Sequence, residues 1–183
     1  TGTLQLRDSR NNYVKYELTD YGRSDHYNGL RNAFENMMSF NGWKISDKFY
    51  YTSILSLDQI GSFVRPSVDI SKLFTGLKNI TLGGSYSSEN NQQLSTLTDT
   101  LTSLSYSFDL WQVYIKSNQK KLNRWGITYF ERANNIPFQN KLIKGDKSRN
   151  ISATTEFLEN KNSQLKMNLT YRVLGVINVG NTN

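Results

Sequence analysis

The sequence predicts an all-β fold, an antiparallel meander of about 8–10 long strands. Three observations predict it. Apolar and polar residues alternate with a period of two in many segments, most regularly in QLKMNLTYRVLGV at 164–176. Short polar stretches typical of turns join these segments, and strands joined so briefly must pair antiparallel. Proline is scarce, with two residues in a chain of 183, which suits long strands.

The alternating segments follow one another along the whole chain. In chain order they are 14–19, 43–56, 64–70, 80–86, 124–132, 151–157 and 164–176. Each predicts a strand with one apolar flank and one polar flank, because successive side chains of a strand point to opposite faces. Between two of these segments, the Asn41-Gly42 pair predicts a tight hairpin, since both residues accept positive φ.

Two stretches are ambiguous between helix and strand. In 28–38, Leu30, Phe34 and Met37 have helical spacing, but the Asn-Gly turn that follows favours a strand paired in a hairpin. In 95–108, leucines recur at a helical spacing among many Ser and Thr residues, which disfavour helix interiors. We expect a strand from about residue 103, with a bulge where the apolar positions change phase between Leu110 and Trp111.

Three irregular features carry further expectations. Pro66 removes a donor from the ladder, so its strand is expected to be an edge, to be bulged or to end there. The polar run 88–91 is expected to be a turn, and 133–149 is expected to form a longer polar loop. These joints and the absence of a glycine-rich linker predict one unit over 1–183, with no boundary between domains.

No residues with an evident catalytic or metal-binding pattern are found. The chain has no cysteine and one histidine, His26 in a predicted loop, so disulfides are excluded and a transition-metal site is not expected. No phosphate-binding loop, dinucleotide fingerprint or nucleophile elbow is present. We therefore expect no catalytic residues, no metal ion and no cofactor, and a protein that is not an enzyme.

The net charge of +7 and the pI near 9.5 leave phosphate groups of nucleic acid or lipid as possible partners. The basic residues are dispersed along the chain, however, and no nucleic acid partner is expected. A nucleic acid interface would require binding that weakens steeply with salt.

Strand length favours a membrane as the medium of the apolar flank. Segments 43–56, 103–117 and 163–176 are longer than the usual strand of about five or six residues, and a tilted strand crosses a bilayer in about 9–11. The polar flank would then face a water-filled lumen. Candidates for it are Lys44, Lys48, Arg65, Arg124, Arg132, Lys166 and Arg172. Candidates for lipid-facing or interfacial positions are Trp43, Trp111, Trp125, Tyr129, Leu165, Leu169 and Tyr171.

RWGITYFERANNIPF (124–138) and DKSRNISATTEFLENKNSQLKMNLTYRVL (146–174) resemble the repeated barrel strands of large outer-membrane proteins of the Bacteroidetes type. The resemblance extends over about residues 100–176. It implies a transmembrane β-barrel or a segment of a larger one, in the outer membrane, with a role in transport, secretion or envelope assembly. Membrane lipid and other outer-membrane or periplasmic subunits are the partners it implies.

The ends of the chain add an expectation. The chain opens without Met and ends Gly180-Asn181-Thr182-Asn183, without the terminal aromatic residue common in such barrels, so we expect a fragment of a longer chain. The alternative is a soluble secreted or cell-surface β-sandwich or open barrel that binds glycan or lipid through exposed aromatics. The cargo, the oligomeric state and the total number of strands are not predicted.

Overall fold

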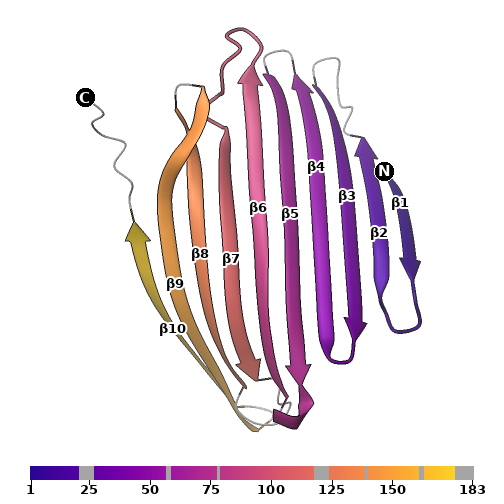
Figure 1. The fold of residues 1–183 in the computed structure, drawn as a ribbon, viewed down its shortest axis with the longest axis vertical. Coiled ribbons are helices and arrows are strands. Elements are labelled where there is room, and N and C mark those ends of the chain that lie inside the picture. The colour runs from indigo at the N-terminus through magenta and orange to yellow at the C-terminus, as the bar shows by residue number, and fades with distance from the viewer. Residues whose placement is uncertain are drawn as a thin grey trace.

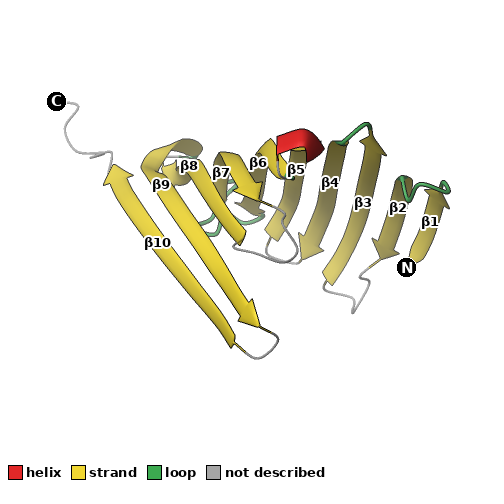
Figure 2. Cartoon of the chain, turned by 90° about the horizontal axis from the view of Figure 1, so that it is seen from below, coloured by secondary structure: helices red, strands yellow, loops and turns green. Residues whose placement is uncertain are grey.

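The computed structural model consists of a single antiparallel sheet whose ten strands are arranged in their order along the chain (Figure 1). The sheet does not close on itself. Figure 2 shows that it is curved and twisted, with β1 and β10 at its opposite edges. The predicted all-β meander is confirmed. The structure describes residues 1–20, 27–56, 59–77, 79–117, 124–138, 140–160 and 163–175, without the side chains of 27–28, 156–160 and 163–166.

The strands are long, and most exceed twelve residues. They are β1 (Gly2–Arg7), β2 (Tyr13–Asp20), β3 (Tyr27–Phe40), β4 (Trp43–Ser56), β5 (Gln59–Phe74), β6 (Ile80–Ser95), β7 (Tyr106–Ser117), β8 (Arg124–Phe138), β9 (Lys141–Asn160) and β10 (Ser163–Gly175). A single turn of 3-10 helix, η1 (Thr75–Leu77), follows β5. No helix in the described part of the chain is long and apolar enough to span a membrane.

The turn between β3 and β4 is the predicted Asn-Gly hairpin. Asn41 and Gly42 have φ of 44° and 77°, and Phe40 pairs with Trp43, which is the arrangement of a two-residue turn. A Cβ on Gly42 would lie 2.7 Å from the Leu73 carbonyl oxygen. The Gly42 carbonyl accepts a hydrogen bond from the Leu73 amide over 2.7 Å, so this turn also packs against β5.

The register gives the sheet two chemically distinct faces. Because directly paired residues of antiparallel strands share a face, the pairs Leu4–Tyr16, Tyr16–Phe34 and Phe34–Phe49 place these side chains together. We call this side the apolar face. Glu35, Lys48 and Ser67 are paired in the same way on the other side, which we call the polar face.

Burial is inverted with respect to an ordinary globular protein. Among the described residues, Ala33 is the only buried hydrophobic one. Small polar and charged residues are buried instead, and most of them belong to the polar face: Ser71, Thr81, Glu89, Ser148 and Asn150. Large apolar side chains of the apolar face are exposed, up to 75% at Leu169. The described part of the chain therefore has no hydrophobic core of its own.

The two ambiguous stretches have different outcomes. Residues 28–38 lie in β3, as predicted. Strand β7 starts at Tyr106 rather than near residue 103, after a loop that includes one isolated bridge between Leu94 and Leu101. The bulge expected between Leu110 and Trp111 is wrong, because β7 keeps one register against both neighbours. Leu110 instead lies on the polar face.

The expectation for Pro66 is also wrong. Strand β5 lies between β4 and β6, inside the sheet. Its pairing with β6 is interrupted at Arg65 and Pro66 and resumes without a shift, because proline has no N–H to donate but need not displace its strand.

Two polar stretches predicted as loops are strands. Residues 88–91 lie inside β6; all four are paired with β7, and Asn90 and Asn91 are also paired with β5. Most of 133–149 lies in β8 and β9, which continue as a hairpin. The ladder between these strands contains a bulge, a register shift between Ala133 and Asn135. Neighbouring strands supply backbone partners to both segments, so low intrinsic strand preference is overridden.

Candidate functional site

The predicted site residues separate onto the two faces as the alternation indicates. Trp43, Trp111, Trp125, Tyr129, Leu169 and Tyr171 lie on the apolar face. Lys44, Lys48, Arg65, Arg124, Arg132 and Arg172 lie on the polar face. The side chains of Leu165 and Lys166, and the whole of His26, lie outside the described residues. The separation fixes which residues share a surface, while the media that the two surfaces contact remain a prediction.

On strands β6–β8, aromatic rings mark the line where the apolar face becomes polar. The Tyr86 hydroxyl donates a hydrogen bond to Asp109 over 2.6 Å, and the Trp111 indole N–H donates to Glu131 over 3.4 Å. The Tyr129 hydroxyl also donates to Glu131, over 3.4 Å. Each ring therefore keeps its apolar body beside the apolar residues and directs its polar atom toward a carboxylate.

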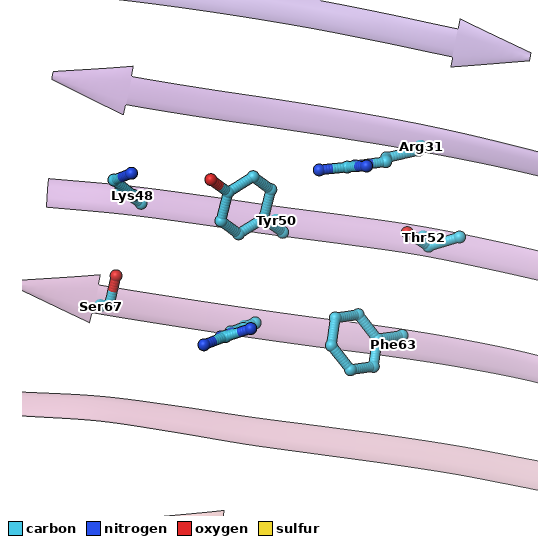
Figure 3. Close-up of a pocket in the computed structure, with 7 residues that line it drawn as sticks. Arg31, Lys48, Tyr50, Thr52, Phe63 and Ser67 are labelled. Carbon is cyan, nitrogen blue, oxygen red and sulfur yellow. The ribbon is translucent and has the colours of Figure 1, made fainter. Parts of the chain in front are cut away.

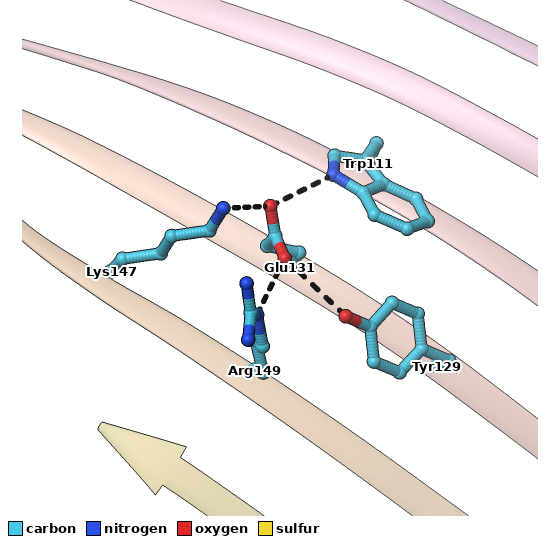
Figure 4. A network of polar contacts seen from close by, with 5 residues as sticks. All are labelled: Trp111, Tyr129, Glu131, Lys147 and Arg149. Carbon is cyan, nitrogen blue, oxygen red and sulfur yellow. Dashed lines mark hydrogen bonds and ion pairs between the residues drawn. The ribbon is translucent and has the colours of Figure 1, made fainter. Parts of the chain in front are cut away.

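Glu131 is the centre of this boundary (Figure 4). Its carboxylate lies 2.6 Å from the Lys147 Nζ and 2.8 Å from the Arg149 Nε, both on the neighbouring strand β9. The rings of Trp111 and Tyr129 are in contact, with centroids 5.2 Å apart. Each carboxylate oxygen of Glu131 thus contacts one cation and one ring donor, and the side chain is 13% exposed.

A second aromatic contact lies at the start of β4 and near the end of β5. Trp43 follows the β3–β4 turn and pairs with Lys72 of β5. The Lys72 ammonium lies 4.7 Å from the Trp43 ring centroid and 5.7 Å from that of Phe74, as expected for a lysine whose stem covers apolar surface.

The apolar face also contains polar pairs, and one of them, on β3 and β4, is level with the Trp111–Glu131 contact in the register of the sheet. Asn36 donates a hydrogen bond to Asp47, its cross-strand neighbour, over 2.8 Å. Ile45 and Phe49 flank Asp47 along β4 on the same face. The pair thus makes one hydrogen bond within an apolar surrounding.

The polar face has a hollow of about 600 Å³ lined by basic and aromatic residues (Figure 3). It spans strands β3, β4 and β5. It is lined by Arg31, Lys48, Tyr50, Thr52, Phe63, Arg65 and Ser67. We call it the basic hollow. Of the residues predicted to face a lumen, Lys48 and Arg65 are brought together here.

Tyrosine hydroxyls hold the carboxylates beside this hollow. Tyr50 donates to Glu35 over 2.7 Å, and Tyr106 donates to Glu89 over 2.5 Å. The nearest cations are farther from the same carboxylates, with Lys48 3.8 Å from Glu35 and Arg65 3.6 Å from Glu89. Lys48 and Arg65 are therefore attracted to these two carboxylates from beyond hydrogen-bond length.

Comparison with known proteins finds no matching protein family, no matching curated protein and no matching solved structure.

Sequence reasoning missed the aromatic residues of the polar face. Tyr106 and Phe108 lie there with parallel rings 6.5 Å apart, and the Arg132 guanidinium lies 4.0 Å from the Phe108 centroid. Their alternation with Leu104 and Leu110 was visible in the sequence. The signal was lost because apolar residues were expected on one face only.

A close aromatic–glycine contact stabilises the same face. Tyr114 of β7 covers Gly83, its partner on β6, so closely that a Cβ on Gly83 would lie 2.5 Å from the tyrosine ring. The Tyr114 hydroxyl donates to Asp69 over 3.2 Å. The missing side chain of Gly83 therefore leaves the space that the Tyr114 ring occupies.

The described residues contain no group of three or more His, Cys, Asp or Glu side chains able to hold a metal ion. Both faces present ion pairs, aromatic contacts and exposed side chains. Such groups can bind and orient another molecule.

Proposed function

We propose that this chain forms part of the wall of a transmembrane β-barrel in an outer membrane, and serves transport, secretion or envelope assembly without catalysis. The observation that carries the proposal is the exposed apolar face of a sheet without an apolar core. Leu4, Leu6 and Leu169 are exposed to 63%, 67% and 75%. Such a continuous apolar surface is unstable in water and must be covered.

Lipid is the cover that best fits the length of the strands and the aromatic residues of this face. Hydrocarbon requires an apolar band about 25 Å tall, with Trp and Tyr at its edges. Strand β4 has 14 residues and extends over roughly 45 Å, which is sufficient to cross such a band at a tilt. The hydrogen-bonded rings of Trp111 and Tyr129 at one border support this reading, because a partner protein layer would not require aromatic residues along a line.

The open sheet implies further strands in the barrel. Strands β1 and β10 each have one neighbour, and their free backbone groups could not remain unpaired in hydrocarbon. Additional strands of the same polypeptide, or other outer-membrane or periplasmic subunits, would pair with these edges and enclose the polar face around water.

Intrinsic tryptophan fluorescence tests the proposal directly. All three tryptophans, Trp43, Trp111 and Trp125, lie on the apolar face, so their emission reports the medium of that face alone. We expect strong quenching by brominated lipid in vesicles and weak quenching by aqueous iodide. A chain that stays monomeric and folded in plain buffer, with iodide quenching its tryptophans efficiently, would contradict the proposal and favour a soluble binding protein.

A further inference from the structure

We infer that the basic hollow on the polar face, formed by Arg31, Lys48 and Arg65 around Tyr50 and Phe63, binds small solutes that carry a phosphate group. The proposed function gives this site its setting, a water-filled lumen through which such solutes would pass. Binding itself requires only the folded sheet, so the two proposals can fail separately.

The distances between cations and carboxylates differ between the Glu131 cluster and the basic hollow. They show in which of the two sites a cation remains available to a ligand. At Glu131 on the apolar face, the cations lie 2.6 and 2.8 Å from the carboxylate, and these short contacts occupy the acid. In the hollow, the separations are 3.8 Å for Lys48 and 3.6 Å for Arg65, beyond hydrogen-bond length. Glu35 and Glu89 are engaged instead by Tyr50 and Tyr106.

The two cations are also accessible. The Lys48 side chain is 43% exposed and the Arg65 side chain is 52% exposed, whereas Glu35 and Glu89 are 21% and 11% exposed. A ligand in the hollow would therefore contact positive charge before it approached either carboxylate. Phosphate matches the fork of an arginine guanidinium, which can donate two parallel hydrogen bonds.

The rings of the hollow would hold the organic part of such a solute. The Arg31 guanidinium lies 5.1 Å from the centroid of the Tyr50 ring, which keeps its plane beside the hollow. Phe63 lies on β5, and Figure 3 shows its ring on the same side of the sheet as Tyr50. A flat apolar group attached to a phosphate would find an aromatic surface next to the cations.

The net positive charge of the whole polar face also favours the binding of anions. Its described cations are more numerous than its acids, and several lie beside the hollow or along the same strands. The cations include Lys15, Arg31, Lys44, Lys48, Arg65, Lys116, Arg132 and Arg172, and the acids include Glu17, Glu35, Asp69 and Glu89. In an enclosed lumen this excess would concentrate anions near the site.

Calorimetric titration of the full chain, folded in detergent, with phenyl phosphate and with inorganic phosphate tests the inference. We expect both to bind, phenyl phosphate more tightly, and phenol not to bind. Arg65→Gln and Lys48→Gln should each lower the affinity about tenfold. Lys44→Gln is the matched control, because Lys44 lies on the same strand and face as Lys48 but does not line the hollow, and should leave the affinity within about twofold.

Circular dichroism would establish that each variant keeps its β structure, and insertion into vesicles would be measured separately. Folded wild-type protein that binds no phosphate would overturn the inference, even if the chain inserts into vesicles. Equal losses in Lys44→Gln and Lys48→Gln would also overturn it, because the general charge of the face would then account for binding. Phosphate binding by a chain that never enters lipid would support this site and contradict the membrane proposal alone.

Discussion

Two single substitutions at adjacent residues of β10 would distinguish most clearly between lipid and water as the medium that each face contacts. Leu169 and Thr170 are adjacent, so they lie on opposite faces, and both are exposed in the sheet. The described residues leave the Leu169 side chain 75% exposed. An arginine introduced at either position would therefore meet no steric obstacle from the described residues.

The loss of folding free energy expected for each arginine variant depends on whether lipid or water contacts the substituted face. If the apolar face contacts lipid, Leu169→Arg should cost about 2–4 kcal/mol of folding free energy in a bilayer, or roughly 30- to 900-fold in the folding equilibrium. Thr170→Arg, on the polar face, should cost less than about 1 kcal/mol. If water bathes both faces, the two variants should be alike within about 0.5 kcal/mol.

Equilibrium urea unfolding of the chain from lipid vesicles is the assay, followed by circular dichroism and with the wild type as reference. Equal stability of Leu169→Arg and Thr170→Arg in vesicles would refute lipid contact at Leu169. A larger loss in Thr170→Arg would reverse the assignment of the faces.

Two further predictions concern local contacts. Gly83→Ala places a Cβ 2.5 Å from the Tyr114 ring and should cost about 1–3 kcal/mol in unfolding experiments, whereas Gly126→Ala, whose Cβ would meet nothing nearer than 3.4 Å, should cost clearly less. Burial opposes ionisation of the Asp8 carboxyl, but hydrogen bonds from Asn12 and from the Arg10 amide outweigh it and lower its pKa. The stability that Asp8 contributes is therefore present above its ordinary pKa near 3.8 and is lost as the pH falls through the lowered value. Asp8→Asn should reduce this acid-dependent loss in urea titrations, and an unchanged pH profile would contradict the role of the turn.

The sequence was sufficient to predict the all-β meander and the two faces of its alternating segments, because a period of two is a property of every strand whatever it contacts. Trp43 and Lys44, or Leu169 and Thr170, are assigned to opposite sides by their positions alone. The Asn41-Gly42 turn was equally predictable, since few dipeptides tolerate positive φ at both positions.

The basic hollow and the Glu131 cluster could not be predicted, because they join strands through a register that depends on every turn between them. Glu131 meets Lys147 and Arg149 only when β8 and β9 continue as a hairpin, where a loop was expected. The polar run at 88–91 and Pro66 were misjudged for a related reason. Both are poor strand residues in isolation, and backbone pairing with a neighbouring strand, β4 for Pro66 and β7 for 88–91, holds them in the sheet.

The most direct test of lipid contact uses the absence of cysteine from the chain, which makes single-cysteine spin labels unambiguous. Labels would be placed one at a time along 167–174 in protein reconstituted in vesicles, and their collision rates with oxygen and with a water-soluble nickel complex measured. We expect labels on the apolar face to collide more often with oxygen, which dissolves in lipid, and labels at the alternate positions to collide more often with the nickel complex. The labels on the apolar face are those at Met167, Leu169, Tyr171 and Val173. Nickel access that is equally high at every position would contradict this expectation.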